Sequence, residues 1–305
     1  MKAKYVNPFT DFGFKKLLFG EEASKDLLAD FLNQLLPPEH QIKKLQFKNT
    51  EQMGALTVDR RAVYDIYCEA ANDSKFIVEL QKAKQNFFKD RTIFYSTFPI
   101  RDQAEQGDWN FELKLVYCVG ILDFVFEEDA NNPDYLHTVK LKNQHHQVFY
   151  EKLVFVYIEM PKFNKTAKQL KTRFDKWLYF IKHLEDFQSI PRMLNDKVFK
   201  KGFQRAEIAN YSRKVLDSYE QSLKIYRDLK KVVDTAFDEG RVEGRAEGRA
   251  EGLQEGKQAA IIERIRRDLQ RGKLTIAEIA EDAEVSVAAG RQLAKPSSGR
   301  KKRKA

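Results

Sequence analysis

The 305-residue sequence has few cysteines and no long hydrophobic run. Cys68 and Cys118 lack the spacing of a metal site and fall in stretches predicted to be buried strands, so we expect reduced core residues and a cytoplasmic protein. The longest apolar run, Leu115 to Phe126, contains Asp123 and is too short and too charged to cross a membrane. The N-terminus has no apolar signal-peptide core, and we expect no membrane partner.

A hydrophobic content of 42% is sufficient for a globular domain with a large core. The formal net charge is +9, but the basic cluster Arg300–Lys304 contributes five of these charges and leaves only +4 for the rest of the chain. Net charge is therefore a weak argument that the folded part binds nucleic acid.

Residues 56–81 predict a β-hairpin around the polar stretch 71–74. A hairpin centred on Asn72 pairs 69 with 75, 67 with 77, and 65 with 79. Asp65 then lies directly across from Glu79, with Gln81 on the same face of the second strand. Alternation along the first strand puts the remaining side chains on two faces: Tyr64, Ile66 and Cys68 on one, and Val63, Asp65 and Tyr67 on the other.

Two carboxylates that face each other across strands repel unless a cation lies between them. Oxygen ligands of this kind suit Mg²⁺ or Mn²⁺, so Asp65 and Glu79 are candidate metal ligands. Spacing alone leaves an alternative open, in which the two acids are scattered charges on the solvent-facing edge of a hairpin.

An aspartate, a hairpin of this length and the run Ile77-Val78-Glu79-Leu80-Gln81 together resemble the core of the PD-(D/E)XK nuclease superfamily. In detail the chain is similar to the bacterial branch of recombination-promoting nucleases and transposases. The similarity includes the opening segment Asn7–Gly20, the segment Arg91–Gly107, the Tyr-rich strand that follows and the glycine repeat, and so covers most of residues 7–260.

The resemblance implies a restriction-endonuclease-like α/β fold, with a mixed central sheet flanked by helices. It implies that Asp65, Glu79 and the backbone carbonyl of Leu80 hold Mg²⁺ or Mn²⁺, and that Gln81 positions the attacking water. The superfamily motif ends in Lys where this chain has Gln81, and Gln also occurs in the branch that it resembles. An amide orients water but brings no positive charge, and Lys82 should point to the opposite face.

Several further residues are candidates with a structural alternative. Asp11 is either an extra acid from an early helix or a helix cap, and Arg91, which shares a helix face with Tyr95, either faces the scissile phosphate or forms a salt bridge. Asp59 lies about 20 Å from Asp65 along a straight strand, too far to share a metal. The next two residues, Arg60 and Arg61, either contact phosphates or are solvated, and we assign the pair His145-His146 to a loop.

Helix and strand signals organise the rest of the chain. We expect a first helix capped by Thr10 or Asp11 and ended by Gly20, and a second capped by Ser24. Further elements are a helix over 89–106 capped by Asp90, a buried strand over 113–126, a hairpin of strands 136–141 and 148–159, and helices over 166–188 and 203–238.

The domain organisation that follows has five parts. We expect a nuclease-like domain over 1–190, a helical extension over 191–238, a Glu-Gly-Arg repeat over 239–257, a small helical tail over 258–294 and a basic tail over 295–305.

The repeat places glycine at every fourth position from Gly240 to Gly256. Stacked glutamates and glycines disfavour an isolated helix, so the repeat is either a flexible tether or a helix that pairs with another copy. In the tail, Thr275 and Glu278 form a capping box, and Ser286 begins a further helix. This arrangement resembles a helix-turn-helix with few base-reading residues (Arg291 and Gln292), so protein contact is the alternative.

The function predicted from these features is Mg²⁺-dependent DNA endonuclease activity, connected with recombination or transposition. The alternatives are a nuclease-fold protein without turnover that binds DNA or forms a homo-oligomer through its C-terminal helices, and a self-assembling protein whose acidic pair is incidental.

Overall fold

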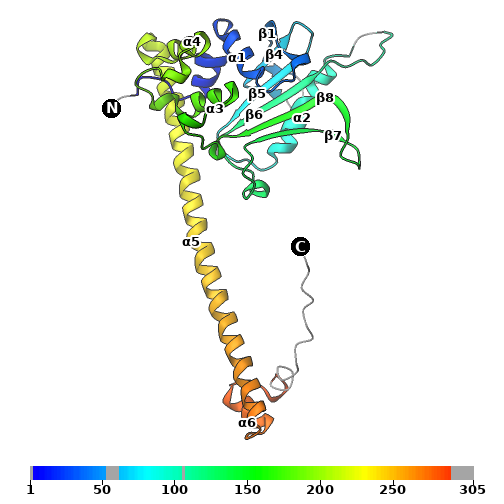
Figure 1. The fold of residues 1–305 in the computed structure, drawn as a ribbon, viewed down its shortest axis with the longest axis vertical. Coiled ribbons are helices and arrows are strands. Elements are labelled where there is room, and N and C mark those ends of the chain that lie inside the picture. The colour runs from blue at the N-terminus through cyan, green and yellow to red at the C-terminus, as the bar shows by residue number, and fades with distance from the viewer. Residues whose placement is uncertain (1–2, 53–61, 105–106, 290–305) are drawn as a thin grey trace. The chain divides into compact units, whose positions relative to one another are not determined.

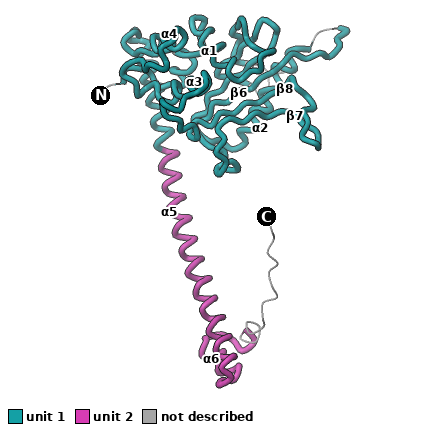
Figure 2. Tube along the Cα trace, in the orientation of Figure 1, with its two compact units in different colours: residues 1–231 teal, residues 232–305 magenta. Residues whose placement is uncertain are grey.

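A computed structural model describes residues 3–52, 62–104 and 107–289. The chain divides into two compact units, residues 1–231 and 232–305 (Figure 2). The sequence-based interpretations of Asp59, Arg60, Arg61, Arg291, Gln292 and the basic tail concern residues outside the described ranges. Nowhere in the described ranges does a helix have the length and apolar character needed to span a membrane.

The first unit is built on a six-stranded mixed sheet with the order β1-β4-β5-β6-β8-β7 (Figure 1). β5, β6 and β8 are parallel, and the outer pairs are antiparallel. The strands are β1 Leu45–Phe47, β4 Ile66–Ala70, β5 Lys75–Gln81, β6 Val116–Leu122, β7 Leu136–Lys142 and β8 Val148–Glu159, and a separate two-stranded sheet joins β2 Glu51–Gln52 to β3 Ala62–Val63.

Helices cover both faces of the sheet, which confirms the predicted fold class (Figure 1). One face packs against α1 Lys25–Leu32, α3 Arg173–His183, α4 Lys197–Ala206 and the start of α5 Arg213–Arg271. The other packs against α2 Phe88–Arg101. The central strand β6 is buried along its whole length, as its continuous apolar run predicts.

The hairpin register is confirmed, because Tyr67 pairs with Ile77 and Glu69 with Lys75. The predicted face of Tyr64 is wrong. The chain bends at residues 64–65 between β3 and β4, so the pleat does not continue, and the Tyr64 ring packs beside Tyr67 with the ring centroids 5.4 Å apart. That bend aims Asp65 at the end of β5.

Helix boundaries differ from the predictions where tertiary contacts override local signals. α2 begins at Phe88, after Phe87 at φ 61°, so Asp90 lies inside the first turn and does not cap the helix. The predicted helix over 166–188 is shorter, because Thr172 caps α3 through the N–H of Asp175.

The predicted helix over 203–238 is interrupted. α4 ends at Ala206 and α5 begins at Arg213. The N-terminal segment pairs with the intervening chain: the Val6 N–H donates to the Ala206 carbonyl at 3.0 Å, and the Ile208 N–H donates to the Lys4 carbonyl at 3.0 Å. Backbone groups engaged in this bridge cannot form the intrahelical ladder, so the helix stops here.

The entry helix is a π-helix over Gly13–Phe19 that ends at Gly20, as predicted. The Thr10 hydroxyl accepts a hydrogen bond from the Gly13 N–H at 3.0 Å, so Thr10 caps this helix. A β-carbon at Gly20 would lie 2.0 Å from the Lys15 carbonyl oxygen, so only glycine permits the chain to close against Lys15 here.

In the second unit, the Glu-Gly-Arg repeat is helical as part of α5, and its side chains are exposed. The tail forms the predicted capping box, with Thr275 and Glu278 at the start of α6 Ile276–Asp282. Ile265 of α5 packs with Ile279 and Ala283, which gives this unit a small apolar core of its own.

Two glycine-to-alanine substitutions should have opposite effects on stability. Gly20→Ala forces the backbone at Lys15 to move and should lower the free energy of unfolding by about 1–3 kcal/mol. Gly248→Ala meets no atom within 4 Å and should stabilise the helix by about 1 kcal/mol. Urea unfolding followed by circular dichroism measures both. A Gly248→Ala protein with reduced helicity would contradict the helical repeat.

Candidate functional site

The two acids of the hairpin meet through a reciprocal set of backbone hydrogen bonds. The Asp65 N–H donates to Glu79 Oε1 at 3.2 Å, and the Leu80 N–H donates to Asp65 Oδ2 at 2.7 Å. Each carboxylate is thus held by the peptide backbone of the opposite strand. The sequence register, the bend at Asp65 and strand β5 together position the pair.

Lys15 supplies the positive charge beside this pair. Its Nζ lies 2.7 Å from Asp65 Oδ1 and 3.3 Å from Asp11 Oδ2. Burial alone would lower the pKa of Lys15, but the carboxylates of Asp65 and Asp11 raise it above its ordinary value. Lys15 was not singled out from sequence. The only local signal was its position four residues after Asp11, which is the ordinary spacing of a surface ion pair.

Asp11 therefore joins the site as a partner of lysines rather than as a helix cap. Lys82 Nζ lies 3.2 Å from Asp11 Oδ1, so Asp11 lies between Lys82 and Lys15. Burial would raise the pKa of Asp11, but the two ammonium groups lower it. Lys82 itself pairs with Asp11 and not with the acidic pair.

The surroundings of Glu79 disfavour the ionised form of its carboxyl group. Burial, reinforced by the negative charge of Asp65, raises its pKa to about 8. The Asp65 N–H and the charges of Arg91 and Lys15 act in the opposite direction but do not cancel this effect. At neutral pH Glu79 is therefore mostly protonated, and a bound cation would take the place of this proton.

Gln81 is held in a fixed orientation by Arg91. An Arg91 Nη2–H donates to Gln81 Oε1 at 2.5 Å, and Gln81 Nε2 donates to the Ala83 carbonyl at 2.8 Å. The Arg91 guanidinium also lies over the rings of Phe88 and Tyr95, at 5.3 and 5.8 Å from their centroids. The predicted shared face of Arg91 and Tyr95 is confirmed, and Arg91 brings its charge to the position where this chain has the amide of Gln81 in place of the motif lysine.

Residues 8–236 of the chain match the family described as PD-(D/E)XK nuclease family transposase. The chain belongs to this family. No curated protein and no solved structure matches it.

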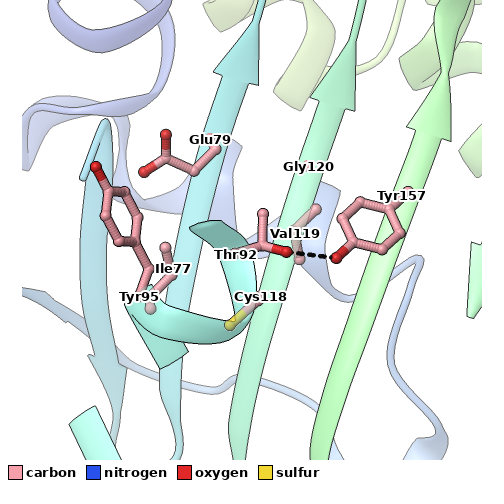
Figure 3. A pocket seen from close by; sticks show the side chains of 8 residues that line it. All are labelled: Ile77, Glu79, Thr92, Tyr95, Cys118, Val119, Gly120 and Tyr157. Atoms are coloured by element: carbon pink, nitrogen blue, oxygen red, sulfur yellow. Dashed lines mark hydrogen bonds between the residues drawn. The ribbon is translucent and has the colours of Figure 1, made fainter. Parts of the chain in front are cut away.

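In this PD-(D/E)XK protein, the face of the sheet beside Glu79 has a small cavity of about 10 Å³, room for about one water molecule (Figure 3). Gly120 lies opposite Glu79 in the parallel register, and a β-carbon there would come within 3.1 Å of the Tyr157 ring. The Thr92 and Tyr157 hydroxyls share a hydrogen bond of 2.7 Å. The cavity is lined by Ile77, Glu79, Thr92, Tyr95, Cys118, Val119, Gly120 and Tyr157.

The donor set fits a hard divalent cation. Asp65 and Glu79 offer carboxylate oxygens, and the Leu80 peptide lies beside Asp65 because its N–H donates to that side chain. The described residues contain no cluster of three or more His, Cys, Asp or Glu side chains of metal-binding geometry, so a cation here would depend on two carboxylates. His145 and His146 lie in an exposed loop, as predicted.

The raised pKa of Glu79 should make stability depend on pH. Between its ordinary value of 4.5 and about 8, the folded protein holds a proton that the unfolded chain has lost. Stability should therefore fall as pH rises through this window, by up to about 1.4 kcal/mol per pH unit. Urea unfolding between pH 5 and 9, without divalent cations, should show a flatter profile for Glu79→Gln.

The matched control for this pH experiment is Glu220→Gln, at an exposed position on α5. It should keep the wild-type pH profile. Equal slopes for wild type and Glu79→Gln would mean that Glu79 is already ionised in the folded protein.

Proposed function

We propose that this protein is a metal-dependent DNA endonuclease that hydrolyses phosphodiester bonds in the cytoplasm and acts in recombination or transposition. The observation that carries this proposal is the backbone-braced Asp65–Glu79 pair at the end of β5, with Lys15 in contact with Asp65 and Gln81 two residues after Glu79 on the same strand. Membership of a nuclease family of transposases supports DNA as the substrate.

Asp65, Glu79 and the Leu80 carbonyl would hold Mg²⁺ or Mn²⁺. Such a cation supplies an activated water and stabilises the charge that develops on the phosphate. Gln81 would orient the attacking water, since Arg91 fixes its amide. The Arg91 guanidinium, planar and permanently charged, would bind a phosphate oxygen and so provide the charge that the motif lysine brings elsewhere.

Lys15 has a separate role in this scheme. Its ammonium group contacts Asp65 Oδ1 and would share that carboxylate with the cation. When no cation is bound, Lys15 stabilises the folded hairpin, because its charge offsets part of the repulsion between Asp65 and Glu79.

The second candidate function is DNA binding without turnover. Two observations favour it: Gln81 stands in place of the catalytic lysine, and Lys15 occupies one side of the Asp65 carboxylate. A protein of this kind would bind DNA in a salt-dependent manner and leave it intact.

Cleavage of supercoiled plasmid DNA distinguishes these functions. The wild-type protein should nick the plasmid with Mg²⁺ or Mn²⁺ and lose activity in EDTA. Asp65→Asn and Glu79→Gln should each reduce the rate about 100-fold or more, because each removes a negatively charged ligand of the cation that would stabilise the transition state.

The control for plasmid cleavage is Glu69→Gln, which removes a carboxylate from the same strand, β4. Glu69 pairs with Lys75 at 2.8 Å, outside the acidic pair, so this variant should retain activity. Cleavage that survives both Asp65→Asn and Glu79→Gln would place the active site elsewhere. Binding without cleavage would favour the second function.

The repeat in α5 supports a further partner, a second copy of the chain. On the helix, the glycine positions are flanked by Glu on one side and by Arg or Lys on the other, with Leu253 as the one exception. In a parallel, in-register pair of helices, the acidic flank of each copy faces the basic flank of its partner. An antiparallel pair would bring acidic flanks together, so charge favours the parallel homo-oligomer.

Deletion of residues 239–257 should reduce the mass measured by light scattering to that of one chain. A matched variant that reverses Arg241, Arg245 and Arg249 to Glu keeps the chain length but makes both flanks acidic. It should also be monomeric. A full-length protein whose mass is already that of one chain, or a deletion variant with unchanged mass, would contradict self-association through the repeat.

A further inference from the structure

Three hydroxyl groups on the first part of α5 hold the segments that form the candidate site. Tyr219, Ser222 and Tyr226 are spaced three and four residues apart and share one helix face, and all three are buried. Each hydroxyl forms a hydrogen bond with a residue far away in the sequence. All of these residues belong to the first unit, 1–231.

Two of the three hydroxyls hold the segment that leads to Lys15. The Tyr219 hydroxyl accepts a hydrogen bond from the Asn7 N–H at 2.7 Å, and the Ser222 hydroxyl accepts one from the Phe12 N–H at 3.1 Å. Phe12 directly follows Asp11 and is the N-cap residue of the π-helix that carries Lys15. The Phe12 N–H thus donates to a side chain of α5 and not to a group of its own helix.

The third hydroxyl is linked to the end of β5. The Tyr226 hydroxyl donates to Asp123 Oδ2 at 2.9 Å. Asp123 directly follows β6, and its own N–H donates to the Gln81 carbonyl at 2.9 Å. A chain of two hydrogen bonds therefore runs from α5 to the last residue of β5, whose side chain contacts Arg91.

We propose that Ser222 and Tyr226 are positioning residues of the nuclease site, because their hydroxyls hold the segments that carry Lys15 and Gln81 beside the Asp65–Glu79 pair. This inference rests on the proposed function for its catalytic consequence, but the positioning itself is independent of activity. The acids are braced by the backbone of their own hairpin, whereas the segments that carry Lys15 and Gln81 are held in addition by hydrogen bonds from a helix more than one hundred residues later in the chain.

Hydrogen–deuterium exchange on the full-length protein tests the positioning without any assay of activity. Ser222→Ala should increase exchange in peptides covering residues 8–16 and leave residues 116–124 unchanged. Tyr226→Phe should leave exchange over 8–16 unchanged and increase it over 79–83 and 116–124. Ser222→Thr keeps a hydroxyl and should restore protection over 8–16.

The control is Ser218→Ala, one turn earlier on the same helix. The Ser218 hydroxyl donates to the Lys214 carbonyl of its own helix, at 3.2 Å, so its removal should change exchange in neither segment. Equal exchange in wild type, Ser222→Ala and Tyr226→Phe would overturn the proposal. So would a uniform increase over the whole first unit, which indicates general loss of stability. If Tyr226→Phe does not fold, Asp123→Ala, which removes the acceptor of the Tyr226 hydroxyl, should increase exchange over 79–83. Asp123→Asn, which keeps an acceptor oxygen for Tyr226, should keep the wild-type protection there.

Plasmid cleavage gives the second readout. Ser222→Ala and Tyr226→Phe should lower kcat about 3- to 10-fold with KM for DNA unchanged, because neither residue contacts the substrate. Ser222→Thr should restore kcat. A wild-type protein without cleavage would remove the proposed function while leaving the exchange result intact, and active variants with altered exchange would show that Lys15 and Gln81 are positioned but not required.

Discussion

The structure of the site depends on how one hairpin tolerates two facing carboxylates. Asp65 and Glu79 lie on opposite strands, where like charges destabilise a sheet. The backbone resolves this conflict, since each acid accepts an N–H from the other strand, and Lys15 adds an ammonium group 2.7 Å from Asp65. Two N–H groups and one lysine still leave Glu79 with a raised pKa. A site in this condition gains stability from an added cation, which is the electrostatic basis of the proposed metal binding.

The superfamily motif has a lysine at the position of Gln81, and in this chain two other residues bring positive charge to the hairpin. A lysine at position 81 would place an ammonium group on the same strand as Glu79. In this chain the charge is divided between Lys15, from the entry π-helix, and Arg91, from α2. The two are not equivalent. The compact ammonium group of Lys15 contacts the Asp65 carboxylate, whereas the planar guanidinium of Arg91 donates to the Gln81 amide. The lysine therefore stabilises the acidic pair, and the role we propose for the arginine is to bind the phosphate.

The hairpin could be predicted from sequence because the residues that determine its register are close together in the chain. Alternating apolar residues and a four-residue polar loop fix a register, and that register brings Asp65 to Glu79. Lys15 could not be predicted in the same way, because its contact with Asp65 joins two segments that only the tertiary fold brings together. The same holds for Tyr64, which changes face at a bend, and for the break after Ala206, where the N-terminus pairs with the chain. Periodicity gave no signal for either.

The Glu-Gly-Arg repeat is helical although its glycines and stacked glutamates destabilise a helix. Each of the five glycines from Gly240 to Gly256 costs a helix about 1 kcal/mol relative to alanine, and the stacked glutamates add repulsion. Within the described chain, no atom lies within 4 Å of where a β-carbon of these glycines would be, and the side chains of the repeat are exposed. A local ion pair such as Arg241 with Asp238, 3.1 Å apart, offsets little of this cost at an exposed position. In the proposed homo-oligomer, a second, parallel copy of the same helix would offset this cost, because the acidic flank of each copy would neutralise the basic flank of the other.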